Sequence, residues 1–343
     1  MAVTRKSCDQ SASARLWVSA LAASAIILCA VQPSHAGEPV PLTAAACTLE
    51  PGDIRTVSRI LDAETVVLDD GREVRLIGAL APRASDAGAV PGAWPAEQEA
   101  LRTLTDLVLG HSVKLAYGGR HTDRYGRHLA HLFLNEAGVE TWVQGELLSA
   151  GVARVYGLPG SNACMTELLA NERLARTARG GLWDTTVYVP KPATMTSLLL
   201  ARRSHFEIVE GTVASVSPTN SGLYLNFGSD WKTDFTIRIG KDVLSSDAGF
   251  AEIARGLAGK AVSVRGWIER RNGPMIDIKD PHQLELPGTA DPAPAISDVT
   301  PPKTTENTNA PGSESGKAKS AKAPVKQKRP AIPRWKPPGA VDL

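Results

Sequence analysis

Five short segments with strand character, interrupted by one helical pattern, constrain the fold of this chain more than any other feature. The segments cover residues 57–61, 65–68, 73–80, 112–117 and 129–134. The sequence Asp69-Asp70-Gly71 is a turn signal that connects the second and third segments as a hairpin. The helical pattern begins at Pro95, and its apolar residues recur on one face. Five strands with a helix between the third and fourth predict an OB-type barrel.

Two more helical patterns follow the strands, around residues 141–150 and 165–179, and the region closes at Gly180-Gly181-Leu182-Trp183. A segment rich in Thr, Pro and Leu, residues 185–204, is predicted to be a linker. Residues 205–287 then repeat a strand-rich pattern with one helix near residues 250–257. The predicted fold class is α+β, mainly β with α: a five-stranded barrel with three helices, followed by a second OB-like β-barrel.

Aromatic side chains of the second region offer two interpretations. Tyr224, Phe227, Trp231, Phe235 and Trp267 could stack on bases, as aromatic residues of OB-folds do, or they could belong to the core. The charge of this region does not favour nucleic-acid binding, because residues 205–286 carry 9 Lys and Arg against 11 Asp and Glu. Residues 50–184 carry 14 against 18, so neither region is broadly basic.

The positive charge of the chain is concentrated near its end. Residues 288–343 alternate Lys and Arg with Pro, Ala and Ser. Such a composition cannot bury enough apolar surface to offset the entropy of ordering, so we expect a disordered basic tail. A tail of this kind could contact an anionic surface.

The N-terminal segment predicts export. Arg5, Lys6 and Arg15 precede an uncharged apolar run over residues 16–31, and Ser34-His35-Ala36 is a small-x-small cleavage site. We expect a signal peptide over residues 1–36, an extension over residues 37–52, and a periplasmic or secreted protein. A retained membrane anchor is the alternative. Cleavage leaves Cys47 and Cys164, which could form one disulfide in an oxidising compartment or remain separate thiols.

Two motifs carry a resemblance to a known family. The segment His121-Thr122-Asp123-Arg124-Tyr125-Gly126-Arg127 contains a D-x-x-G-R turn, and Val74-Arg75-Leu76 begins the strand end that reaches Arg83. Together they resemble the thermonuclease (staphylococcal-nuclease-like) family over about residues 53–184. The resemblance implies an OB-fold domain that binds and hydrolyses single-stranded DNA or RNA. It also implies a calcium ion, a carboxylate base and two catalytic arginines.

The cationic part of that site is retained. Arg75 and Arg127 match the two catalytic arginines of the family, and Tyr125 matches a position that contacts the bound nucleotide. A guanidinium group can hold a phosphate through two parallel hydrogen bonds. An alternative for Arg127 is a salt bridge near Asp123 that only holds the turn.

The calcium ligands and the base are replaced. The two aspartates of the family correspond to Glu64 and Leu80, and the threonine that offers its oxygen corresponds to Ala81. Calcium prefers six to eight oxygen ligands, and an apolar side chain supplies none. Arg83 occupies the position of the glutamate base, and a guanidinium cannot accept a proton from water. We therefore expect no cofactor, and calcium-dependent hydrolysis lost or much reduced.

Three functions remain open from the sequence. First, Arg75, Arg83 and Arg127 could form a metal-free pocket for nucleic acid or another phosphate ligand, without cutting it. Second, Asp86, Asp70 or Glu97 could replace the lost carboxylates in an active phosphodiesterase. Third, the two domains could bind proteins in the cell envelope, with the tail on an anionic membrane or wall polymer.

Overall fold

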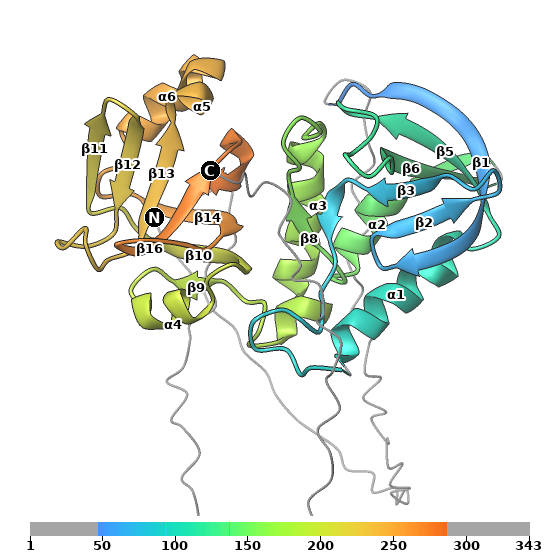
Figure 1. The fold of residues 1–343 in the computed structure, drawn as a ribbon, viewed down its shortest axis with the longest axis horizontal. Coiled ribbons are helices and arrows are strands. Elements are labelled where there is room, and N and C mark those ends of the chain that lie inside the picture. Colours follow the sequence, from blue (N-terminus) through green and yellow to red (C-terminus); the bar gives the residue numbers. More distant parts are fainter. Residues whose placement is uncertain (1–46, 93, 137, 287–343) are drawn as a thin grey trace, which may run out of the picture. The chain divides into compact units, whose positions relative to one another are not determined.

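The computed structural model describes residues 47–92, 94–136 and 138–286, which fall within one compact unit of the chain (Figure 1). The expected signal peptide, most of the extension and the basic tail lie outside the described residues. The described part combines several β-sheets with six α-helices, so the α+β class is confirmed. No helix within it is long and apolar enough to cross a lipid bilayer.

The first domain is a closed β-barrel. Its sheet has the order β3-β2-β1-β5-β6-β7. A parallel pairing of β3 with β6 closes the strands from β3 to β6 in this order into a ring. The strands of the closed ring are β1 (Glu50–Asp62), β2 (Thr65–Leu68), β3 (Glu73–Leu76), β5 (Ser112–Tyr117) and β6 (His128–Glu136). A further strand, β7 (Val139–Trp142), extends the sheet as a hairpin with β6. The predicted number and order of the barrel strands agree with this arrangement.

Strand β1 is more than twice as long as predicted and serves two neighbours. Its first half pairs with β5 and its second half, from Val57, pairs with β2, as the curved ribbon in Figure 1 shows. The prediction placed residues 37–52 in an extension and began the first strand at Val57. Gly52 is needed in the first half of β1, since a Cβ atom at this position would lie 2.9 Å from the Cβ of Leu115.

The predicted third strand is divided into two. Strand β3 ends at Leu76, and after Gly78, which has φ +85°, the chain forms β4 (Gly78–Leu80). Strand β4 leaves the barrel and pairs antiparallel with β8 (Arg154–Tyr156), with Leu80 opposite Arg154. This positive φ favours glycine, and the turn determines where Leu80 and the residues after it are placed.

Three helices pack against the barrel, as predicted. They are α1 (Pro95–Val108), α2 (Val143–Ser149) and α3 (Met165–Ala178). Ala100, Leu104 and Val108 form the buried face of α1 and belong to the barrel core. The short 3-10 helix Gly181–Asp184 buries Leu182 and Trp183 after α3.

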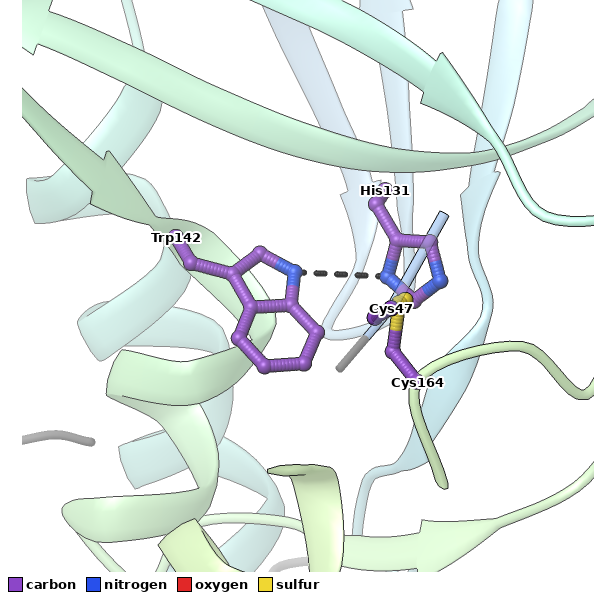
Figure 2. The surroundings of a disulfide bond; sticks show 4 residues. All are labelled: Cys47, His131, Trp142 and Cys164. Carbon is purple, nitrogen blue, oxygen red and sulfur yellow. Dashed lines mark hydrogen bonds between the residues drawn. A yellow bond between two sulfur atoms is a disulfide. The ribbon is translucent and has the colours of Figure 1, made fainter. Parts of the chain in front are cut away.

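A disulfide bond joins Cys47, just before β1, to Cys164, just before α3, across a sequence separation of 117 (Figure 2). His131 lies beside it and is completely buried, and its Nδ1 accepts a hydrogen bond of 3.3 Å from the Trp142 indole. Burial lowers the pKa of His131 to about 3, so this imidazole stays neutral at ordinary pH.

Replacing both Cys47 and Cys164 by alanine should lower the free energy of unfolding by about 4 to 5 kcal/mol, because the bond closes a long loop in the unfolded chain. Urea unfolding measures the change. A reductant should destabilise the unmodified protein to a similar extent and have no effect on the double variant. Equal stability of the two proteins would mean that the bond contributes nothing.

The second domain is built from two sheets. One has the order β17-β14-β10-β9, and the other has the order β11-β12-β13-β16-β15. Among the described residues no strand pair joins the two sheets, so the domain consists of two separate sheets. The predicted second OB-like barrel is not confirmed. Its elements are β10 (Phe206–Thr212), β11 (Ser215–Thr219), β12 (Gly222–Asn226), β13 (Thr236–Gly240), α5 (Lys241–Ser246), α6 (Ala248–Arg255), β14 (Ala261–Trp267), β15 (Glu269–Arg271), β16 (Gly273–Ile278) and β17 (Leu284–Glu285).

The segment expected to be a linker contains regular structure. Strand β9 (Lys191–Pro192) pairs with β10, and α4 (Thr196–Ala201) follows it. The Lys191 ammonium is 5% exposed and donates hydrogen bonds to three carbonyl groups, those of Thr186, Val187 and Val189. The lysine contacts hold the segment together, and the pairing of β9 with β10 attaches it to the second domain, a role that its composition did not indicate.

A buried ion network connects the two domains. Arg265 on β14 pairs with Glu172 on α3 and with Glu285 on β17, and all three side chains are nearly inaccessible. Arg176 on α3 adds a contact to Glu210 of 3.2 Å. Burial alone would raise the pKa of Glu285, but the charge and hydrogen bond of Arg265 outweigh it, so the pKa is lowered. The network therefore keeps the Glu285 carboxylate ionised inside the protein.

Replacing Arg265 by leucine should cost about 3 to 5 kcal/mol of stability at neutral pH, since Glu172 loses its arginine and Glu285 keeps only the longer contacts of Arg173 and Arg176. Arg265 is the main cause of the lowered pKa of Glu285, so the stability that it contributes is lost as pH falls, and the deficit of the variant shrinks in the same direction. Urea unfolding at neutral and mildly acidic pH measures this.

An Arg102→Leu variant is the matched control for Arg265, because Arg102 pairs with Glu99 on an exposed face of α1. Exposed pairs of this kind contribute at most about 1 kcal/mol. A deficit of Arg265→Leu that is as small as that of the control would contradict a stabilising network.

Candidate functional site

One pocket gathers the residues that the sequence singled out. It has a volume of about 1210 Å³ and lies where β3, β4 and the loop before β6 meet. Arg75, Arg83, Arg127 and Tyr125 all line it. Two further arginines, Arg120 and Arg124, and three aspartates, Asp62, Asp86 and Asp123, complete its charged lining.

The carboxylate of Glu64 lies behind the pocket lining, in contact with Arg75 and Arg83. It is 2% exposed, and one of its oxygens, Oε2, lies 2.8 Å from Nη2 of Arg83 and 3.2 Å from Nη2 of Arg75. Its other oxygen accepts the backbone N–H of Ala81 at 2.9 Å. Burial alone would lower the pKa of Arg83, but the charge and hydrogen bond of Glu64 outweigh it, so the pKa is raised and the guanidinium stays charged.

This arrangement does not fit a calcium ion. Both oxygens of Glu64 already interact with a guanidinium or an N–H group, and Leu80 is packed into an apolar cluster with Leu129 and Tyr156. Within the described ranges, no three His, Cys, Asp or Glu side chains are placed to hold a metal ion. A hard cation needs several free oxygen ligands, and these residues do not supply them.

The turn that carries Arg127 is held by Asp123. The carboxylate accepts the backbone N–H groups of Tyr125 and Arg127 at 2.8 and 3.0 Å, and the Arg127 side chain at 2.8 Å. Burial alone would raise the pKa of Asp123, but these hydrogen bonds outweigh it and the pKa is lowered. The salt bridge that the sequence left open as an alternative role for Arg127 is therefore present.

The three expected phosphate-binding arginines are thus all ion-paired. Arg75 and Arg83 share Glu64, and Arg127 pairs with Asp123, which reduces the positive charge that the sequence suggested. Their side chains remain 13%, 33% and 24% exposed. A guanidinium carries five N–H donors, so each arginine keeps donors beyond those used in its ion pair.

Arg120 and Arg124 were missed by the sequence argument, although both lie within or next to the quoted motif. In the described part of the chain neither is ion-paired with a carboxylate: Arg120 donates to the carbonyl of Pro159 at 2.9 Å, and Arg124 lies 5.0 Å from the ring centre of Tyr125. Their position beside Arg127 in the sequence was a usable signal. They supply the pocket's least compensated positive charge.

The carboxylates proposed as replacements are engaged elsewhere. Asp86 lines the pocket, but one of its oxygens accepts the Arg83 N–H and the Tyr188 hydroxyl, each at 3.0 Å. Glu97 accepts the N–H of Ala84 at 3.0 Å. Asp70 does not line the pocket and pairs with Arg72 at 2.7 Å. None of the three is placed as a free base.

His121 and His128 also have defined partners. His121 stacks on Tyr117 at 4.1 Å and lies 3.0 Å from a Glu50 oxygen, and the Nδ1 of His128 lies 3.1 Å from the Tyr117 hydroxyl. Neither lines the pocket. Neither imidazole is therefore placed to contact a phosphate bound in this pocket.

Comparison with known families agrees with the geometry. Residues 73–185 match the family model described as staphylococcal nuclease homologue. The chain therefore contains a domain of this family, and the predicted resemblance is confirmed for the first domain. A comparison with curated proteins finds no match.

Calcium should leave the thermal stability of the unmodified protein unchanged, because Arg83 already neutralises Glu64. A ligand present at a hundred times its Kd would add about 2.7 kcal/mol. Thermal unfolding in millimolar calcium and in chelator should therefore give the same midpoint.

A double variant, Leu80→Asp with Arg83→Glu, provides the comparison for this calcium test. It returns two carboxylates to the floor of the pocket and removes the guanidinium that competes with a cation. We expect its midpoint to rise in calcium. A rise in the unmodified protein would contradict the absence of a calcium site.

Proposed function

We propose that this pocket binds the phosphodiester backbone of single-stranded nucleic acid and does not cleave it by a calcium-dependent route. The ion pair between Arg83 and Glu64 carries the proposal. It directs a permanent positive charge at the one acidic residue left from the family's calcium ligands. The family membership of the domain supports a function related to nucleic acid.

Phosphate binding is supported by the donors that face the pocket. No carboxylate among the described residues forms an ion pair with Arg120 or Arg124, and Arg75 and Arg127 offer N–H groups beyond their ion pairs. Hydrogen bonds between guanidinium groups and phosphate oxygens are among the strong ones in proteins. Because guanidinium groups in general stay protonated at neutral and mildly basic pH, we expect phosphate binding to be insensitive to pH between about 7 and 9.

Loss of cleavage follows from the missing proton acceptor. Hydrolysis needs a group that takes a proton from the attacking water, and Arg83 cannot do so. Asp86, Glu97 and Asp70 are each held by other donors. The pocket thus keeps groups that stabilise negative charge on phosphate, while a cation occupies the position of the family's base.

We further propose that the protein acts outside the cytoplasm. The disulfide between Cys47 and Cys164 supports this, since such bonds persist mainly in oxidising compartments. The export signal predicted over residues 1–36 supports the same location, and we propose that the basic tail contacts an anionic surface. Both lie outside the described residues.

Binding of a labelled single-stranded oligonucleotide should be equally strong in calcium and in chelator, and the strand should remain intact. Replacing Arg124 or Arg127 by alanine should weaken binding about tenfold or more, since a hydrogen bond to a charged group contributes about 1.5 to 3 kcal/mol. Each replacement should also reduce the slope of log affinity against log salt by about one. Fluorescence anisotropy measures both quantities.

Arg102→Ala is the control for these variants, because Arg102 lies on the exposed face of α1 and does not line the pocket. It should bind like the unmodified protein. Cleavage of the strand in calcium would contradict the proposal, and so would equal binding by all four proteins.

A further inference from the structure

We propose that the second β domain forms a base-binding wall of this pocket, so that the two domains share one site for a nucleotide unit of a single strand. Phosphate would lie on the arginines of the first domain, and the base would lie against His205, Phe206 and Trp267 of the second. This inference rests on the proposed function and adds the feature that the ligand's bases are recognised.

The second domain reaches the pocket through two adjacent segments. Ser204, His205 and Phe206 line it, and so does Trp267, which pairs directly opposite Phe206 between β10 and β14. His205 is half-buried, whereas Phe206 is 4% exposed, so the imidazole is the more accessible ring.

Backbone contacts fix this part of the wall. Ser204 adopts φ +67°, an uncommon conformation for a residue other than glycine, and its N–H donates to the carbonyl of Ile268 at 2.8 Å. The N–H of Ile268 in turn donates to the carbonyl of His205 at 2.9 Å. The first hydrogen bond holds Ser204, and the second holds His205 next to it. Backbone strain of this kind is found preferentially at functional sites.

The rings at the wall form one contiguous aromatic cluster that crosses from one domain to the other. Tyr156 of β8 packs edge-to-face on Phe206 and on Trp267, with ring centres 5.5 and 6.3 Å apart. Phe206 and Trp267 are 5.9 Å apart. Leu80, at the position where calcium chemistry would need an oxygen, belongs to the same cluster. An apolar wall therefore faces the arginines.

Arg154 attaches this wall to the first domain. It is 3% exposed, its Nη1 donates to the carbonyl of Phe206 at 2.8 Å, and its guanidinium lies 5.3 Å from the centre of the Phe206 ring. Its Nη2 lies 3.5 Å from Asp86, which lines the same pocket. The wall is therefore a fixed part of the site and not a neighbouring surface.

The chemistry of the two sides selects a single-stranded ligand. Arginines bind phosphate regardless of sequence, while aromatic rings stack on any base that exposes its face. In a duplex the base faces are covered by neighbouring base pairs. The volume of about 1210 Å³ is somewhat larger than the roughly 300 to 1,000 Å³ of pockets for small ligands, and it suits one or a few nucleotides.

Two ligands of equal length and charge test the inference: a short oligothymidylate, and an oligomer of abasic deoxyribose phosphate. The unmodified protein should bind the oligothymidylate about tenfold more tightly or better, because each stacked base adds affinity. Trp267→Leu and His205→Ala should each reduce this preference, and neither should weaken binding of the abasic oligomer.

Trp231→Leu is the matched control, because Trp231 is a 57% exposed tryptophan of the same domain and does not line the pocket. It should keep the full preference. Melting curves show whether each variant is folded. If Trp267→Leu folds poorly, His205→Ala, which removes a half-buried ring, still tests the proposal.

The outcomes separate the two proposals. Equal binding of both oligomers, still dependent on Arg124 and Arg127, would overturn the base-binding wall and leave phosphate binding intact. A preference that survives both wall variants would also overturn it. Absence of binding to either oligomer would overturn both proposals together.

Discussion

The contact between the buried carboxylate of Glu64 and the guanidinium of Arg83 determines the rest of this site. An ionised group costs several kcal/mol to bury unless charge and hydrogen bonds compensate it. Glu64 is compensated by two arginines and one backbone N–H, so its neighbours are fixed. The backbone N–H of Arg83 then binds Asp86, and Asp86 contacts Arg154, which holds the second domain.

A guanidinium and a calcium ion neutralise a carboxylate in different ways. The ion exchanges with solvent, can polarise bound water and leaves coordination positions open. The arginine is covalently attached, stays protonated, and offers only N–H donors. Arg83 therefore preserves the electrostatic balance around Glu64 and removes the chemistry that an ion would provide. Phosphate binding without calcium-dependent hydrolysis, as proposed above, would be a consequence of this one replacement.

The sequence predicted the local parts of this structure well and the long-range parts poorly. The strand segments and the helix that begins at Pro95 follow from patterns within short windows. The family resemblance, and not a local pattern, pointed to Arg75, Arg83 and Arg127 as pocket residues. The ion pairs of Glu64 follow from neither, because Glu64 meets Arg83 only after β3 and β4 bend at Gly78. The first half of β1 was hidden by Pro51, since edge positions tolerate residues that strand statistics exclude.

The aromatic residues of the second domain show why a ligand-facing surface is harder to predict than a core. Five of them were equivalent candidates in sequence, yet Phe235 is completely buried, Trp231 is exposed on a loop, and Trp267 lines the pocket. What distinguishes Trp267 is the docking of the two domains, which depends on the buried pairs of Arg265 with Glu172 and Glu285. Because docking creates the wall, ligand binding and domain contact are linked. A ligand that binds both sides of the pocket must stabilise the docked arrangement to the same extent that docking improves its affinity.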